Sequence, residues 1–163
     1  MLYTWVESGG GPLVVVPGSR LVHWGGAEDC EGPEETGDYG LACAVEGYIG
    51  LVPVGGGQGL VLGDEPAMTT WLPDERCFLR WSAADSEAGL VDAARRALRS
   101  DVEWDERLTW DVDGPVVLFD SAWPGAEPGN QVGIDLEPGT YDVRSVYRED
   151  DRNWMILVHL QPV

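Results

Sequence analysis

Carboxylates are the most abundant side chains in this sequence that could take part in chemistry. The 163 residues include 29 Asp and Glu against 10 Lys and Arg, and every one of those basic residues is arginine. The best local pair is Asp64-Glu65, which ends a predicted strand just before Pro66. Paired carboxylates can act as general acid and base, but adjacent side chains of an extended segment point in opposite directions. We therefore interpret Asp64 and Glu65 either as solvated acids of a turn or as an acidic contact for a basic partner.

Cysteine and histidine could supply a metal site or a nucleophile. Cys30, Cys43, Cys77 and His23 have the ligand types of a Cys3His zinc site, but structural zinc sites use close cysteine pairs such as Cys-x2-Cys, and the sequence has none. His159 lies in an apolar segment, where packing explains it better than catalysis. An odd cysteine count favours a reducing compartment. We therefore predict free thiols, no disulfide, no metal, no cofactor and no enzymatic activity.

Two regions concentrate acidic residues. The first spans residues 28–38 and holds six acids without a base, namely Glu28, Asp29, Glu31, Glu34, Glu35 and Asp38. The second is the polar face of a strand predicted over residues 103–113, with Glu103, Asp105, Asp111 and Asp113. The buried face of that strand would hold Trp104, Leu108, Trp110 and Val112, and Glu106 breaks this alternation. Runs of like charge are usually solvated, but they also oppose folding. Binding to a basic partner therefore explains these acids as well as solvation does.

Eight tryptophans are many for this length, and most of them must be core residues. Trp24 and Trp123 have Gly- or Pro-rich neighbours, which predicts that their side chains lie near the surface. Aromatic side chains at a surface often anchor protein interfaces. Trp24 and Trp123 are thus our candidate anchors for a partner.

The elements that must position these residues are mostly short strands separated by Gly and Pro turns. We predict strands over residues 12–17, 48–54, 59–63, 77–84, 103–113, 116–120, 134–136, 141–147 and 154–160. The second and third of these should form a hairpin across the glycine-rich turn of residues 55–58. In residues 85–100 the apolar period changes to that of a helix, with Leu90, Ala94, Ala97 and Leu98 on one face. The predicted fold is α+β: a mostly antiparallel sheet with one principal helix over about residues 86–99. We expect a single domain over residues 1–163, with an internal boundary near residue 101 between an α+β half and a β-meander.

Charge excludes several classes of partner. The formal charge is −19 and the pI is about 4.1, whereas sequence-independent binding to nucleic acid or to anionic membranes needs a positive surface. The N-terminal residues lack the basic and apolar regions of a signal peptide, and no apolar run reaches about 18 residues. We therefore expect a cytoplasmic protein that binds neither nucleic acid nor membrane.

A set of motifs is distinctive as a group over roughly residues 5–120. They are Trp5-Val6-Glu7-Ser8-Gly9-Gly10-Gly11-Pro12-Leu13, Asp38-Tyr39, Ala42-Cys43-Ala44-Val45, Leu62-Gly63-Asp64-Glu65-Pro66-Ala67, Arg80-Trp81, Ala84-Asp85-Ser86-Glu87, Trp110 and Asp113-Gly114-Pro115. With these motifs the chain resembles the immunity protein 21 family of bacterial polymorphic toxin systems. The resemblance implies a non-catalytic cytoplasmic protein that binds and neutralises a cognate toxin domain.

The acidic composition is compatible with that expectation, since an acidic surface could cover a basic active face, such as that of a nuclease, on the toxin. The same residues also permit a different class of function. A small hydrolase or ligand-binding domain could use Asp64 and Glu65 in an acidic pocket lined by tryptophan. Both alternatives stay open at the level of sequence.

Overall fold

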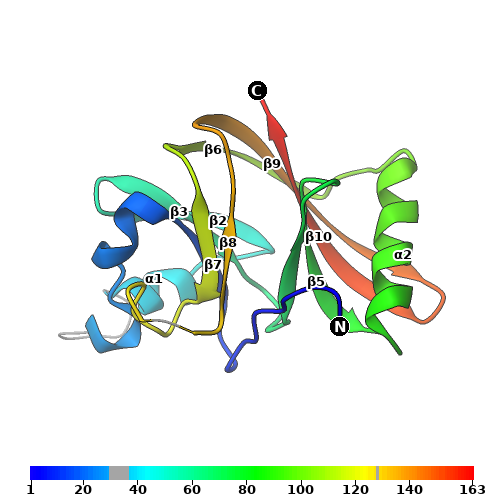
Figure 1. Cartoon of the computed structure of the whole chain (residues 1–163), viewed down its shortest axis with the longest axis horizontal. Coiled ribbons are helices and arrows are strands. Elements are labelled where there is room, and N and C mark those ends of the chain that lie inside the picture. Colours follow the sequence, from blue (N-terminus) through cyan, green and yellow to red (C-terminus); the bar gives the residue numbers. More distant parts are fainter. Residues whose placement is uncertain (30–36, 128) are drawn as a thin grey trace.

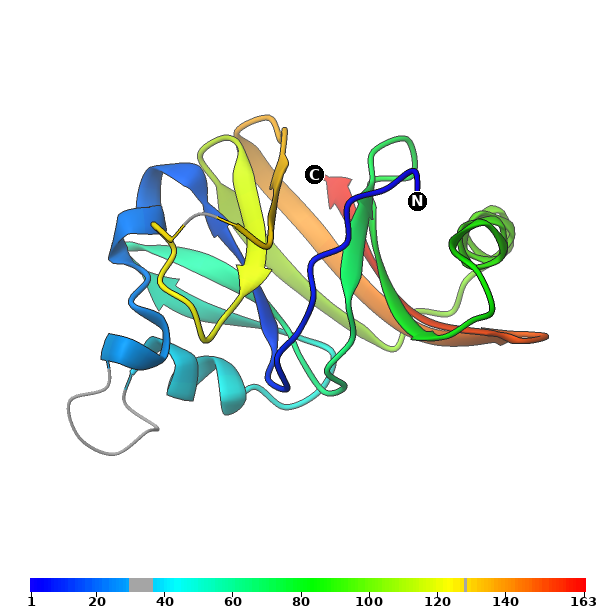
Figure 2. The same ribbon diagram turned by 60° about the horizontal axis from the view of Figure 1, so that its bottom comes forward.

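Two antiparallel sheets stack face to face, and a helix, α2 (Glu87–Arg99), covers the outer face of one of them (Figure 1). The computed structural model describes residues 1–29, 37–127 and 129–163. Figure 2 views α2 almost end-on and shows it on the side of its sheet that faces away from the other sheet. This arrangement confirms the predicted α+β class, with a mostly antiparallel sheet structure and one principal helix.

The first sheet is built around the valine-rich segment. Its strand order is β2-β3-β1-β7-β8, and the strands are β1 (Leu13–Pro17), β2 (Ile49–Val54), β3 (Gly57–Leu62), β7 (Val116–Asp120) and β8 (Gln131–Ile134). All five residues of β1 are buried, because it lies in the middle of the sheet and both of its faces are covered. Strands β2 and β3 form the predicted hairpin.

The second sheet carries α2. Its order is β4-β5-β10-β9-β6, and the strands are β4 (Thr69–Leu72), β5 (Cys77–Ala83), β6 (Glu106–Val112), β9 (Gly139–Asp150) and β10 (Asn153–Pro162). Each sheet combines strands from before and after residue 101. One face of the second sheet lies against the first sheet, and its other face lies against α2.

The two faces of the second sheet contribute to two different cores. Phe78, Trp110 and Val158 are fully buried between the sheets, and the Trp110 Nε1–H donates to the Gln58 carbonyl at 2.9 Å. On the other face, Leu79 and Leu157 pack against the apolar side of α2. This division follows from the alternation of side chains along a strand.

Helix α2 begins where its sequence indicates. The Ser86 Oγ accepts a hydrogen bond from the Gly89 N–H at 3.1 Å, which is the geometry of an N-cap. Leu90, Ala94 and Ala97 are buried against the sheet, as the helical period predicts. No helix among the described residues is long and apolar enough to cross a membrane.

Three short helices lie where no helix was predicted. They are η1 (Gly18–His23), η2 (Gly26–Asp29) and α1 (Asp38–Cys43). Gly26 has φ +62°, and a Cβ there would come within 2.6 Å of the Ala122 carbonyl oxygen. Gly26 and Ala27, just before the acidic region of residues 28–38, therefore pack directly against the segment that carries Trp123.

The strand predicted over residues 103–113 begins later than expected. Strand β6 starts at Glu106, and Trp104 does not share a face with Trp110. Trp104 stacks on His159, with ring centroids 5.8 Å apart, on the α2 side of the sheet, whereas Trp110 lies in the core between the sheets. The prediction that Trp104 lies on the buried face with Trp110 was wrong because the chain bends at Asp105, so the alternation of β6 does not extend back to Trp104.

The cap of α2 can be tested by mutation. Replacing Ser86 with Ala should lower the free energy of unfolding by about 1 kcal/mol, because the Gly89 N–H loses its acceptor. Ser86→Asp keeps an acceptor and should retain stability close to that of the wild type. Urea denaturation of the three proteins measures the effect, and equal stability of Ser86→Ala and wild type would contradict the assigned cap.

Candidate functional site

Four carboxylates from two distant parts of the chain gather around Tyr48. They are Asp64 and Glu65, which follow β3, and Asp105 and Glu106, at the start of β6; we call them the acidic cluster. Burial is the main reason that the pKa of the Tyr48 phenol lies above its usual value, and the charges of all four carboxylates raise it further. The fold thus brings together acids that the sequence places in separate groups.

The β6 half of the acidic cluster is tied to the first sheet by a hydrogen bond. The Tyr48 N–H donates to the Glu106 Oε2 at 2.9 Å. Gly47 precedes it with φ +87°, and a Cβ at this position would lie 2.5 Å from Glu106 Oε1. A glycine is required here because it allows the backbone to reach the carboxylate.

The other half of the acidic cluster is positioned by a buried arginine. Arg80, in β5, is fully buried and donates from Nη1 to the Gly63 carbonyl at 2.6 Å and from Nη2 to the Glu65 carbonyl at 2.7 Å. Burial lowers the pKa of the Arg80 guanidinium to about 10, while the nearby charges of Glu65 and Asp64 act in the opposite direction. The cation therefore fixes the backbone of the segment between β3 and β4.

A hollow of about 460 Å³ adjoins the acidic cluster. Glu46, Asp64 and Glu65 line it, and Tyr39 and Cys43 of α1 form part of its wall. The alternative function, a hydrolase or ligand-binding domain, was expected to have an acidic pocket lined by tryptophan. Among the described residues, the aromatic side chain that lines this hollow is a tyrosine, Tyr39. A concave acidic surface of this kind is suited to receiving a basic side chain.

The other acids of the second region lie elsewhere or have other partners. Asp113 accepts from the Ser19 Oγ at 2.6 Å and lies 4.0 Å from an Arg20 nitrogen. Asp111 accepts from the Thr140 Oγ1 at 2.6 Å. These contacts are at the opposite end of β6 from Asp105, so the predicted face does not act as one site. Glu103 is exposed just before the strand.

The first acidic region is described only in part. Asp38 begins α1, and its Oδ2 accepts from the Gly25 N–H at 2.8 Å, which gives this acid a structural role. The backbone of Glu28 and Asp29 belongs to η2. Glu31, Glu34 and Glu35 lie outside the described residues.

The two candidate tryptophans differ from each other. Trp24 is 1% exposed, packs edge-on against Phe119 and donates its Nε1–H to the Ser121 carbonyl at 3.0 Å, so the prediction of a surface side chain was wrong. The glycines beside it allow the chain to turn while the indole points inward, and its N–H finds a partner there. Trp123 is 56% exposed, as expected, in a hollow that Glu7 and Glu127 also line.

Cysteine and histidine do not assemble into a reactive site in the described part of the chain. Cys43 is an exposed free thiol, and Cys77 is a fully buried one whose pKa is raised by burial. Cys30 lies outside the described residues. Among the residues that the structure describes, no group of three His, Cys, Asp or Glu side chains could hold a metal ion.

Sequence reasoning missed Tyr48, Glu46 and Glu106 as members of this surface. Glu106 did give a signal, because it is a charged residue at an apolar position of the predicted strand. Nothing local marks Tyr48, since its neighbours in the acidic cluster come from residues 64–65 and 105–106. Their proximity depends on how β2, β3 and β6 meet.

Comparison of the sequence with known proteins identifies one matching family. The family model described as Immunity protein 21 matches residues 4–153 of the chain. No curated protein and no solved structure is significantly similar to it.

The role of Arg80 predicts a large stability effect. Arg80→Met leaves the carbonyls of Gly63 and Glu65 without donors, so the free energy of unfolding should fall by about 3 kcal/mol. Arg152→Met is the control, because Arg152 is exposed and its effect should stay within about 0.5 kcal/mol. Urea denaturation compares them, and a similar small effect at both positions would contradict the proposed anchoring.

The surroundings of His159 predict that the stability of the protein depends on pH. Its Nδ1 accepts from Arg144 Nη2 at 2.8 Å, and burial, with the charge of Arg144, lowers the pKa of the imidazole to about 4. The unfolded chain takes up this proton below about pH 6.5 and the folded chain does not, so stability is lost as the pH falls from 6.5 toward 4.

The matched variants are His159→Gln and His23→Gln, the second at an exposed histidine. Between pH 7.5 and 5 the wild type should lose about 1 kcal/mol more than His159→Gln, allowing for the solvent that reaches the ring. His23→Gln should follow the wild type. Parallel pH profiles for wild type and His159→Gln would show that the ring is protonated equally well in both states.

Proposed function

The chain belongs to the immunity protein 21 family, and we propose that it neutralises a cognate toxin by covering a basic face of that toxin with the acidic cluster. A nuclease is the class of toxin with the most obvious basic face, because its substrate is a polyanion. In this proposal the protein acts in the cytoplasm as a stoichiometric inhibitor with no catalytic activity of its own, and it binds neither nucleic acid nor membrane.

The observation that carries the proposal is the convergence of Asp64, Glu65, Asp105 and Glu106 at Tyr48. The Tyr48 N–H donates to the Glu106 carboxylate, the Tyr48 carbonyl accepts from the Gly63 N–H next to Asp64, and all four acids act on the Tyr48 phenol. Like charges held close together destabilise a folded protein. The fold nevertheless fixes the backbone that carries Asp64 and Glu65, through hydrogen bonds from the buried Arg80 cation to the carbonyls of Gly63 and Glu65. A basic partner would relieve the repulsion and gain the interaction energy, which gives this arrangement a use.

The chemistry of such a surface predicts how it would bind. Clustered charge raises the rate of association by steering a partner of opposite charge, and salt screens this effect over about 8 Å at physiological ionic strength. Affinity depends more on a few desolvated anchors. Trp123 remains the candidate anchor, since it is exposed and its backbone lies against Gly26, two residues before the acidic region of residues 28–38.

The test is a set of neutralising variants measured against the cognate toxin domain. The combined change Asp64→Asn, Glu65→Gln and Asp105→Asn removes three charges of the acidic cluster and leaves the Glu106 hydrogen bond to Tyr48 intact. We expect the association rate to fall by about tenfold or more at low salt, with a much smaller difference at high salt. A second variant neutralises Glu28, Asp29, Glu31, Glu34 and Glu35.

The matched control is the combined change Asp111→Asn, Asp113→Asn and Asp135→Asn, which removes the same number of charges from exposed positions outside the acidic cluster. Its association rate should stay close to that of the wild type. If this control slows association as much as the cluster variant, net charge and not the cluster governs binding. If no variant changes the rate, the acids serve solubility.

A further inference from the structure

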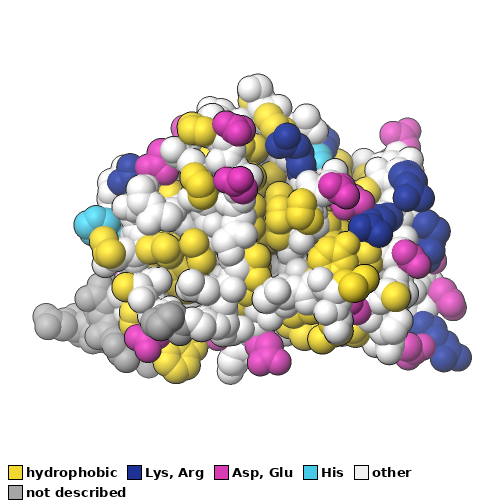
Figure 3. Space-filling model, in the orientation of Figure 1, with side chains coloured by type: hydrophobic (Ala, Val, Ile, Leu, Met, Phe, Trp, Pro, Cys, Tyr) yellow, Lys and Arg dark blue, Asp and Glu magenta, His cyan; other side chains and the backbone are white. Residues whose placement is uncertain are grey.

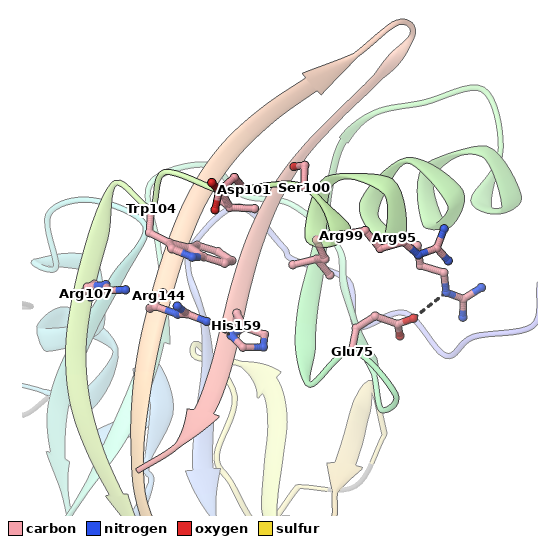
Figure 4. A pocket seen from close by; sticks show the side chains of 11 residues that line it. Glu75, Arg95, Arg99, Ser100, Asp101, Trp104, Arg107, Arg144 and His159 are labelled. Carbon is pink, nitrogen blue, oxygen red and sulfur yellow. Dashed lines mark hydrogen bonds and ion pairs between the residues drawn. The ribbon is translucent and has the colours of Figure 1, made fainter.

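We propose that a cleft on the opposite face of the second sheet binds a small phosphorylated molecule through Arg107, Arg144 and Arg99. The cleft has a volume of about 490 Å³ and lies between the C-terminal end of α2 and strands β6, β9 and β10 (Figure 4). Small-molecule sites usually have volumes of about 300 to 1,000 Å³. This cleft is separate from the acidic cluster.

Basic side chains are strongly segregated in this protein. Nine of the ten arginines lie in the second sheet, α2 or the turns of that layer, and only Arg20 lies with the first sheet. On the face of the molecule that Figure 3 shows, most of the arginine side chains, in dark blue, lie on the side of α2. The lining of the cleft itself carries an excess of positive charge, with four arginines, Arg95, Arg99, Arg107 and Arg144, against the two acids Glu75 and Asp101.

A row of basic side chains crosses three neighbouring strands in register. Arg107 of β6 is directly opposite Arg144 of β9, which in turn is opposite His159 of β10. Figure 4 shows these three side chains side by side, with Trp104 next to them. Like charges directly opposite each other on a sheet are destabilising. An arginine pair at such positions, in a chain with 29 acids, indicates an anion that compensates it.

The arginines of the cleft have unused hydrogen-bonding capacity. Within the described part of the chain, Arg99 and Arg107 form no ion pair and no side-chain hydrogen bond. The Arg144 Nε is buried without a hydrogen-bond partner, and its nearest carboxylate oxygen, on Asp142, is 3.9 Å away. Arg95 already has a close partner, since it pairs with Glu75 at 2.8 Å, whereas the ion pair of Arg144 with Asp142 is long at 3.9 Å.

The wall of the cleft is rigid enough to hold a ligand. The Arg144 guanidinium lies 4.8 Å from the centre of the Trp104 ring and donates to His159 Nδ1. Because Nδ1 is the acceptor, the neutral imidazole carries its hydrogen on Nε2 and can serve as a further donor. Stacking and hydrogen bonding thus fix Arg144 before any ligand arrives.

The charge balance favours a small phosphate ester over other anions. A single carboxylate is satisfied by one bidentate arginine, whereas a phosphate offers more oxygens and more charge to several guanidinium groups. A long nucleic acid or an acidic protein would be repelled by the rest of this acidic surface. A small molecule can enter the cleft without approaching that surface.

The experiment is calorimetric titration of the whole chain with AMP, ribose 5-phosphate, inorganic phosphate, adenosine and citrate. Binding should be saturable for the phosphate esters, absent for adenosine and weak for citrate. Binding of inorganic phosphate as tight as that of the esters would also support the site and would identify free phosphate as the ligand. No saturable binding of any phosphate compound, or tighter binding of citrate, would overturn the proposal.

The variants locate the binding. Arg107→Gln and Arg144→Gln should each weaken phosphate-ester binding at least tenfold, while the exposed control Arg152→Gln should not change it. The melting temperature of ligand-free Arg107→Gln should equal or exceed that of the wild type, because the repulsion from Arg144 is removed. Unchanged binding in Arg107→Gln would show that Arg107 is not a ligand contact. A clearly lower melting temperature without ligand would show that the arginine pair is not under repulsion, which would remove the reason to expect a compensating anion.

Discussion

The buried guanidinium of Arg80 is the interaction on which the arrangement of the charged surfaces depends. A cation removed from water is costly unless hydrogen bonds satisfy it. The carbonyls of Gly63 and Glu65 and the hydroxyl of Thr69 provide acceptors for Arg80. All three belong to the segment that leads from the first sheet to the second. The same contacts that make burial possible therefore define how the chain crosses between the sheets.

One strand supplies residues to both charged sites. Glu106 and Arg107 are neighbours in β6, and side chains of successive residues in a strand point to opposite faces. Glu106 consequently joins the acidic cluster beside Tyr48, while Arg107 faces Arg144 in the basic cleft. The sheet keeps the two sets of charges apart, and this separation allows one small protein to offer surfaces of opposite sign.

Prediction from sequence was most successful where the period of the apolar residues shows which side of an element is buried. The helix with Leu90, Ala94 and Ala97, the hairpin of β2 and β3 and the buried run of β1 all have patterns that one packing arrangement satisfies. It failed for Trp24 and Trp104. Local composition does not tell which way an indole points when the backbone turns, and each of these rings found its partners, Phe119 and His159, on distant elements.

The sequence by itself determined the acidic character, the α+β class and the family, because composition, period and motif order are properties of the chain. Tertiary structure alone decided which charges meet. Asp64 and Asp105 are 41 residues apart yet lie near the same phenol, and Arg107 and Arg144 face each other across adjacent strands. The physical reason is that electrostatic energy depends on distance in space, and these distances follow from strand order and register.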